Sequence, residues 1–92
     1  MASRVDIQAI YNLENWRERL IACKNEAQRA LDDLETTYKC CQNYLIDDHL
    51  EEFSRRMNEI KNAIDDLDAE IKGCDGKIKE KVLKLKRLIY RK

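Results

Sequence analysis

Apolar side chains recur along the first half of the chain in alternating steps of three and four residues. The series begins at Ile10 and ends at Leu45, and nine of its eleven positions are apolar or aromatic. Its members are Ile10, Leu13, Arg17, Leu20, Lys24, Ala27, Leu31, Leu34, Tyr38, Cys41 and Leu45. An apolar period of about 3.5 residues, kept over about five heptads, is typical of helices that pack side by side. The pattern predicts a helix over about residues 4–45.

A second series with the same spacing occupies the rest of the chain. It comprises Leu50, Phe53, Met57, Ile60, Ile64, Leu67, Ile71, Cys74, Ile78, Lys81, Leu85 and Leu88. The step from Leu45 to Leu50 is five residues, and Asp48 with Glu51 resembles a capping box at a helix start. We therefore predict a turn at about residues 46–48 and a second helix over about 49–90. One continuous helix is the alternative, because no Gly or Pro forces a break there.

The predicted fold is all-α: an antiparallel two-helix hairpin of the coiled-coil type, forming one domain over residues 1–92. If the turn centres near residue 47, the numbers of facing residues add up to about 94 or 95. Tyr38 is then expected opposite Met57. Gly73 and Gly76 lie off the seam between the helices, and glycine weakens a helix. A bend or frayed segment is therefore expected at 73–76.

Three charged residues, Arg17, Lys24 and Lys81, occupy positions of the apolar seam. Their long aliphatic stems can cover the seam while the charged ends reach water. Two of the three are expected to lie nearer the open end of the hairpin, where the chain termini meet. The open end is therefore predicted to pack more loosely than the turn end.

Composition narrows the possible classes of protein. The chain has 92 residues, 39% of them charged, with two glycines and no proline. This excludes collagen-like and Pro-rich chains and disfavours a sheet that needs many turns. No apolar run of about 18 residues is present to span a membrane, and residues 1–10 do not resemble a cleavable signal peptide. We expect a cytoplasmic protein whose cysteines are reduced.

The sequence contains no constellation that predicts catalysis, a metal site or a cofactor. The lone histidine, His49, is expected to be exposed in the turn, and no Gly-rich phosphate loop is present. Cys41 and Cys74 occupy seam positions, where cysteine packs as a small hydrophobe. Cys40 is expected to face outward and to oxidise most readily. A disulfide between Cys23 and Cys74 is a minor alternative.

Apolar residues outside the seam indicate a partner. Each helix of a hairpin buries only one stripe, so a partner that completes a four-helix bundle would cover the remainder. The expected partner interface consists of Trp16, Cys23 and Ala30 on the first helix and Val82, Ile89 and Tyr90 on the second. The partner is either another helical protein or a second copy of the chain.

The charges divide the hairpin into two halves, although the chain as a whole has no net charge. Residues 24–70, the turn half, carry thirteen acidic and six basic side chains, a net charge of −7. Residues 1–23 and 71–92, the open half, carry twelve basic and five acidic side chains, a net charge of +7. This polarity favours antiparallel self-association or docking on a similarly polarised partner.

The segment 77–92 is basic and amphipathic, a pattern found in helices that bind anionic membranes or nucleic acid. We expect its apolar side to be used inside the bundle, however. The sequence therefore predicts neither nucleic-acid nor membrane binding as the main role. Peripheral membrane binding through 77–92 remains an alternative, beside a self-dimerising coiled-coil adaptor.

Over residues 5–90 the chain resembles the small helical-hairpin proteins of type VII secretion. The resemblance rests on the helix–turn–helix architecture, on Phe53 early in the second helix, and on Tyr44-x-x-x-Asp48, which fits an aromatic-x-x-x-acid export pattern. The Trp-x-Gly motif of that family is absent from the turn. The chain is more similar to the motif-poor small partners of LXG-domain toxins.

That resemblance implies a non-enzymatic targeting or chaperone-like protein that binds the helical N-terminal domain of a secreted toxin. It also implies export by a route that needs no cleaved signal peptide. Tyr44 and Asp48 would form its recognition motif. The alternative for this pair is an aromatic residue in the last helical turn followed by a helix cap.

Overall fold

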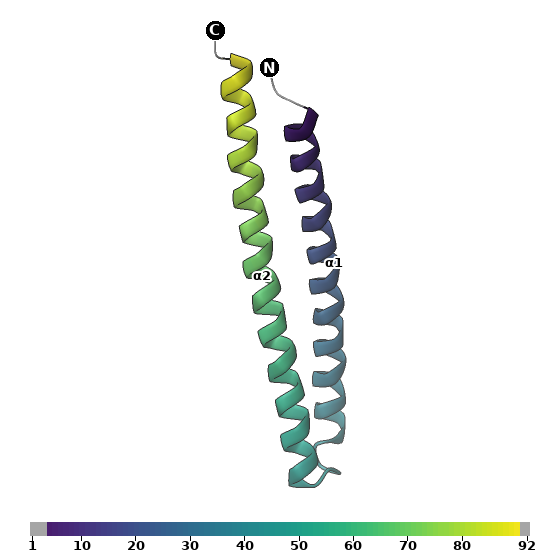
Figure 1. The fold of residues 1–92 in the computed structure, drawn as a ribbon. Helices are drawn as coiled ribbons and strands as arrows, with labels where there is room; N and C mark the ends of the chain where they lie inside the picture. Colours follow the sequence, from purple (N-terminus) through teal and green to yellow (C-terminus); the bar gives the residue numbers. More distant parts are fainter. Residues whose placement is uncertain (1–3, 91–92) are drawn as a thin grey trace.

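Two long helices joined by a short turn make up the structure (Figure 1). The computed structural model describes residues 4–90, apart from the side chain of Val5. Helix α1 spans Arg4–Cys41 and helix α2 spans Asp47–Tyr90. The helices run antiparallel and form a rod of 71 × 15 × 14 Å, with the start of α1 and the end of α2 at the same tip. The predicted all-α hairpin is confirmed.

The turn comes earlier in the chain than predicted. Helix α1 ends at Cys41 instead of about residue 45, and α2 begins at Asp47 instead of about residue 49. The N–H of Tyr44 donates to the carbonyl of Cys41 at 2.8 Å, a three-residue bond that tightens and ends the helix. Leu45 therefore lies in the turn, although it continues the apolar spacing of α1.

The predicted cap of the second helix is also wrong. The carbonyl of Ile46 accepts hydrogen bonds from the N–H groups of His49 at 3.0 Å and Leu50 at 3.1 Å. Ile46 is therefore the residue that opens α2, and Asp47 and Asp48 lie inside the first turn. Acidic side chains are favourable there because the helix dipole is positive at its N-terminus.

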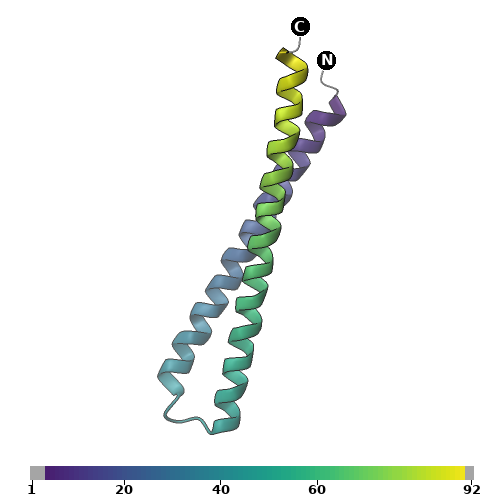
Figure 2. The same cartoon turned by 90° about the vertical axis from the view of Figure 1, so that its left-hand side faces the viewer.

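The core of the hairpin lies in the middle of the rod. Among the described side chains, only those of Leu20, Leu31, Ile64 and Cys74 are buried, and none is below 2% exposed. All four belong to the predicted seam. Figure 2 shows that α1 passes behind α2 near the middle of the rod in this view. The seam is thus correctly predicted, but few of its residues are fully enclosed.

Contacts between the helices show a register that differs from the predicted one. Tyr38 packs against Phe53, with ring centroids 6.2 Å apart and ring planes tilted by 57°. The numbers of this pair add up to 91 instead of 94 or 95. The earlier turn explains the direction of the shift, because it moves each residue of α1 opposite a residue nearer the start of α2.

The two glycines do not interrupt α2. The helix is continuous from Asp47 to Tyr90, and neither Gly73 nor Gly76 has a positive φ angle. Figures 1 and 2 show no sharp kink in α2. Regular helical hydrogen bonds and the seam on either side therefore hold the glycines in the helix, and the expected fraying at 73–76 does not occur.

Candidate interaction surfaces

Large apolar side chains remain on the surface of the hairpin. Among the described residues, they are Ile7, Tyr11, Trp16, Tyr44, Ile46, Leu83, Leu88, Ile89 and Tyr90. Seven of these nine belong to the open half, and the other two lie in the turn. Large exposed apolar side chains that gather in one region of a small protein are candidates for a binding site. The open half is therefore the main candidate region.

The predicted interface of α1 is accessible along one side of the helix. Trp16 is 50% exposed, and Cys23 and Ala30 are also exposed. The three residues follow one another at intervals of seven, which places them on the same helix face beside the seam. We call Trp16, Cys23 and Ala30 the α1 flank. It is uncharged and available to a partner.

The predicted interface residues of α2 do not form a single surface. Val82 and Ile89 are seven residues apart and share one side, where Val82 is half-buried and Ile89 is exposed. Tyr90 is 81% exposed and shares a different side with Leu83, seven residues before it. The sequence prediction grouped Tyr90 with Val82 and Ile89, and the heptad positions separate them.

Two exposed residues of α1 were missed by the sequence analysis. Ile7 and Tyr11 are both more than half exposed and lie four residues apart, hence on one helix face. The apolar seam begins at Ile10, and Ile7 and Tyr11 lie off it, so the seam pattern does not include this second apolar face. The four-residue spacing of Ile7 and Tyr11 was the available signal.

Tyr44 and Asp48, the recognition pair that the resemblance implies, lie at the turn end. Tyr44 is 88% exposed within the turn, and Asp48 is exposed in the first turn of α2. The structure brings both residues to the same end of the rod. Tyr44 is not in the last turn of α1, as the simpler interpretation of this pair required, because α1 ends at Cys41.

The charged seam residues of α1 find acidic partners on α2. Lys24 Nζ lies 2.6 Å from Asp68 Oδ1, and Arg17 Nε forms an ion pair with Asp75 Oδ1. The two pairs are one heptad apart on both helices and are partly exposed, so each contributes little stability. Both pairs fit the observed register, and a slip of one helix along the other would separate them together.

A cluster of charges near the turn holds Glu52. Arg55 Nη2 donates to both carboxylate oxygens of Glu52, at 2.7 and 2.6 Å, and Arg56 Nε donates to one at 3.0 Å. The hydrogen bonds from Arg55, and then the one from Arg56, lower the pKa of the Glu52 carboxyl below its usual value. The cluster is local to α2.

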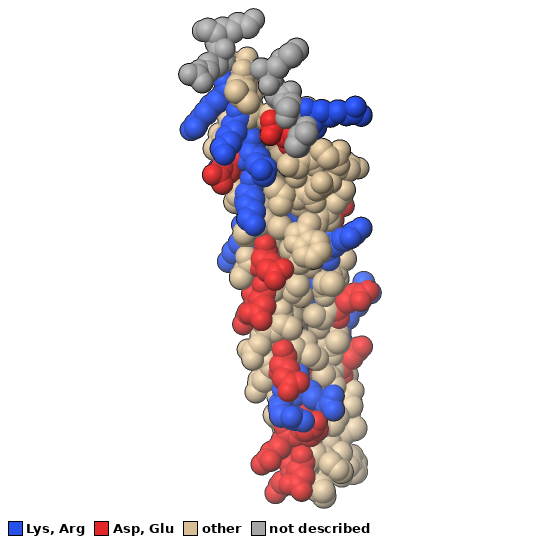
Figure 3. Space-filling model, in the orientation of Figure 1, with Lys and Arg blue, Asp and Glu red and all other residues tan. Residues whose placement is uncertain are grey.

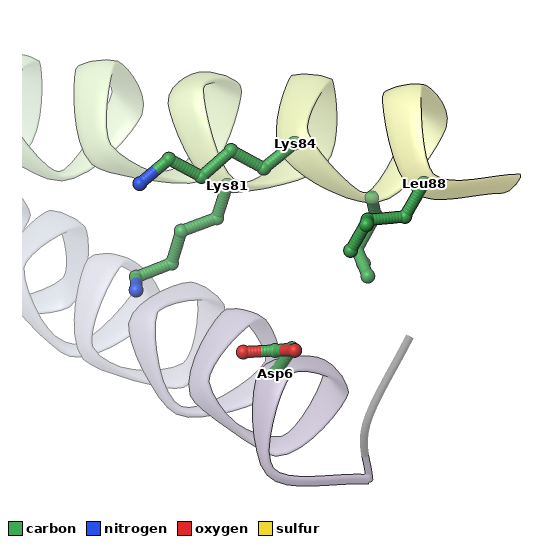
Figure 4. Close-up of a pocket in the computed structure, with 5 residues that line it drawn as sticks. Asp6, Lys81, Lys84 and Leu88 are labelled. Carbon is green, nitrogen blue, oxygen red and sulfur yellow. The ribbon is translucent and has the colours of Figure 1, made fainter. Parts of the chain in front are cut away.

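A hollow of about 140 Å³ separates the helices at the open end. Asp6, Lys81, Lys84, Leu85 and Leu88 line it. Figure 4 shows Lys81 reaching from α2 across to α1, at a seam position where most layers of the hairpin hold an apolar side chain. The predicted looseness of the open end therefore has a local cause in Lys81.

The opposite charges of the two halves are visible on the surface. In the view of Figure 3, blue side chains gather over the C-terminal part of α2 and red ones predominate toward the turn. Neither helix of the described chain has a stretch that is long and apolar enough to cross a membrane.

The cysteines and acidic residues of the described chain form no evident reactive centre. All four cysteines are free; Cys74 is buried, Cys41 is half-buried, and Cys23 and Cys40 are exposed. No three His, Cys, Asp or Glu residues of the described part lie together in a way that could hold a metal ion. No protein family, curated protein or solved structure compared with the chain matches it.

Proposed function

We propose that this protein is a non-enzymatic interaction module that packs against another helical protein and completes a helical bundle. The observation that carries the proposal is the imbalance between four buried side chains and nine large apolar ones left on the surface. Helices of a stable bundle bury a wider apolar stripe than one neighbour can cover. A partner helix bound to the α1 flank would bury Trp16 and cover the apolar surface that α2 leaves exposed.

The finer form of the proposal is a targeting or chaperone-like role toward a secreted effector whose N-terminal domain is helical. The hairpin architecture supports it through its resemblance to the small partners of LXG-domain toxins. The Tyr44-x-x-x-Asp48 pattern supports it separately, because it fits the export pattern of the type VII secretion hairpins. In this role the hairpin shields an apolar helix face of the effector until export. Tyr44 and Asp48, both exposed at the turn end, would then be presented to the export apparatus.

A second candidate function is a self-dimerising scaffold, favoured by one observation. The two halves carry net charges of equal size and opposite sign, −7 and +7. An antiparallel pair of identical hairpins places unlike charges side by side at both ends. Such a dimer would weaken as salt rises, because exposed charges are screened.

Co-purification of the tagged full chain from its native host, in moderate salt and with mass spectrometry of the bound proteins, tests the main proposal. We expect a second protein with a helical N-terminal domain to remain bound. The variant Ala30→Asp places a charge on the α1 flank and should reduce its recovery about tenfold, since an unpaired charge at an interface is costly. The matched control Asn25→Asp adds the same charge at an exposed position off the flank and should leave recovery unchanged.

Two results would contradict this proposal. Recovery of the chain alone, as a salt-sensitive dimer, would favour the scaffold. Equal recovery with Ala30→Asp and Asn25→Asp would show that the partner does not use the α1 flank.

A further inference from the structure

An apolar stripe on the last turns of α2 faces away from α1. Leu83 is 45% exposed and Tyr90 is 81% exposed, and their spacing of seven places them on one side of the helix. Leu83 lies five residues after the half-buried seam residue Ile78, and Tyr90 lies five residues after the half-buried seam residue Leu85. A step of five residues turns about 140° round the helix axis, so Leu83 and Tyr90 point away from the seam. The hairpin core therefore cannot cover Leu83 or Tyr90. The sequence analysis expected the apolar side of residues 77–92 to be used inside the bundle, but Leu83 and Tyr90 lie outside the hairpin core.

Basic side chains border this stripe on both sides. Lys86 and Arg87 each lie three or four residues from both Leu83 and Tyr90, and Lys79 lies four residues before Leu83. Residues at these spacings are neighbours on a helix surface. All three basic side chains are exposed. We call Lys79, Leu83, Lys86, Arg87 and Tyr90 the basic tip.

We propose that the basic tip docks on a bilayer surface that contains anionic lipid. Tyr90 and Leu83 enter the headgroup region, and Lys79, Lys86 and Arg87 lie against lipid phosphates. Tyrosine suits this depth because its ring is apolar while its hydroxyl stays hydrated. Lysine and arginine keep their charge in water while their stems cover apolar surface. Helices that lie at a membrane interface combine these same features.

The charge of the whole open end supports a lipid occupant. Residues 77–92 carry eight basic side chains and one acidic one, a net charge of +7. Duplex DNA would satisfy these charges, but its outer surface offers little to an exposed Leu83 and Tyr90. An anionic bilayer offers both phosphates and an apolar interior. The combination of exposed apolar and basic groups thus favours lipid over nucleic acid.

The turn end provides an internal contrast and fixes the orientation. It also exposes an aromatic and an aliphatic residue, Tyr44 and Ile46, but these stand next to Asp47 and Asp48. An anionic surface repels that end. The rod would therefore attach by its open end and hold the acidic turn away from the bilayer. The α1 flank stays available to a helical partner, so this inference does not depend on the proposed function.

Co-sedimentation of the full chain with vesicles tests the proposal. One vesicle contains three parts phosphatidylcholine to one part phosphatidylglycerol, and the other contains phosphatidylcholine alone. We expect binding to the anionic vesicle only. Binding should fall steeply between about 0.1 M and about 1 M salt, as the Debye length shortens from about 10 Å to about 3 Å.

Two variants separate the apolar and the electrostatic contributions. Leu83→Ser with Tyr90→Ser keeps every charge and should weaken vesicle binding about tenfold, while binding to a DNA duplex stays as in the unaltered chain. Lys79→Gln, Lys86→Gln and Arg87→Gln together should weaken vesicle binding about 100-fold, since each basic group near an anionic surface contributes about fivefold. The matched control, Tyr44→Ser with Ile46→Ser, removes the same kind of surface at the turn end and should bind as well as the unaltered chain.

Several results would overturn the proposal. The first is equal binding to both vesicles, and the second is undiminished vesicle binding by the Leu83→Ser, Tyr90→Ser variant. The others are binding to DNA but not to vesicles, and formation of a salt-sensitive dimer that does not bind vesicles. Far-UV circular dichroism of each variant guards against loss of the fold. The substituted side chains are exposed, so helix content should not change.

Discussion

The two ends of the hairpin follow the same heptad pattern but pack differently. Near the turn, Tyr38 of α1 contacts Phe53 of α2 across the seam. At the open end, Lys81 occupies the seam, a hollow lies beside it, and Leu88 is exposed. A heptad pattern therefore predicts which faces of two helices meet, while the side chain at each layer decides how closely they meet.

The same two regions differ in charge and in exposed apolar surface. The turn half is acidic and exposes large apolar side chains only in the turn itself. The open half is basic and exposes seven such side chains on its helices. The turn end of the rod thus combines exposed apolar side chains with negative charge, and the open end combines them with positive charge.

Truncation of seam residues should give the largest difference, between the middle of the rod and its open end. Leu31→Ala removes a buried side chain and should lower the free energy of unfolding by about 3 kcal/mol. Leu85→Ala removes a half-buried one at the open end and should cost about 1 kcal/mol. Urea denaturation followed by circular dichroism, at a fixed protein concentration, measures both.

A pair of smaller truncations tests the same difference if the Leu31→Ala variant does not fold. Ile64→Val, in the core, should cost about 1 kcal/mol, and Ile78→Val, toward the open end, about half of that. Equal costs within each pair would show that the open end is packed as tightly as the middle of the rod.

Replacement of both glycines of α2 should stabilise the hairpin by about 1–2 kcal/mol in total. A Cβ atom built at Gly73 or Gly76 meets nothing within 4 Å, and neither residue has a positive φ. Gly73→Ala and Gly76→Ala therefore remove backbone freedom from the unfolded chain without strain. Thermal unfolding measures the gain, and Ala69→Gly, at another exposed position of α2, should give a loss of similar size per residue.

Restoring an apolar residue to the open-end seam should give a gain of about 1 kcal/mol. Lys81→Leu places a side chain beside Leu85 and Leu88, next to the hollow. The control Lys79→Leu makes the same replacement at an exposed position off the seam and should give no comparable gain. If the two variants have equal stability, Lys81 is not the cause of the looser packing.

The smallest expected effect is a pH dependence that arises near the turn. Arg55 and Arg56 lower the pKa of Glu52 in the folded state, so their ion pairs stabilise the fold above the ordinary value of 4.5. This contribution is lost as the pH falls through the lowered pKa. Glu52→Gln should therefore be slightly less stable than the unaltered chain at neutral pH and equal to it in acid. Glu51→Gln, which removes the neighbouring negative charge, is the control.

The sequence predicted the broad architecture because helix pairing depends on a repeating pattern. The seam from Ile10 to Leu88 includes all four buried residues, and the loose open end followed from charged residues at seam positions. The residues at which the helices begin and end were harder to predict from the sequence. Leu45 and Asp48 satisfied the apolar spacing and the capping pattern, but the hydrogen bonds of Tyr44 and Ile46 end α1 and open α2 elsewhere. Which backbone hydrogen bonds form at a helix end is decided locally, and this choice produces no periodic pattern in the sequence.

The candidate surfaces were only partly predictable for the same reason. The α1 flank follows from heptad positions alone, and its exposure agrees with that reading. The acidic partners of Arg17 and Lys24 were not predicted, because Asp75 and Asp68 are defined by the register between the helices. Tyr90, which the sequence analysis grouped with Val82 and Ile89, lies on a different side of α2 from them.

By itself the sequence determined that this protein is a pair of antiparallel helices with an acidic turn half and a basic open half. These properties depend on the apolar period and on the order of charges along the chain, and both can be obtained from the amino-acid sequence alone. Only the tertiary structure decided where the turn forms, which layers close and which apolar side chains stay outside. Those features depend on the register and on the distance between two helices, and both arise only when the helices pack.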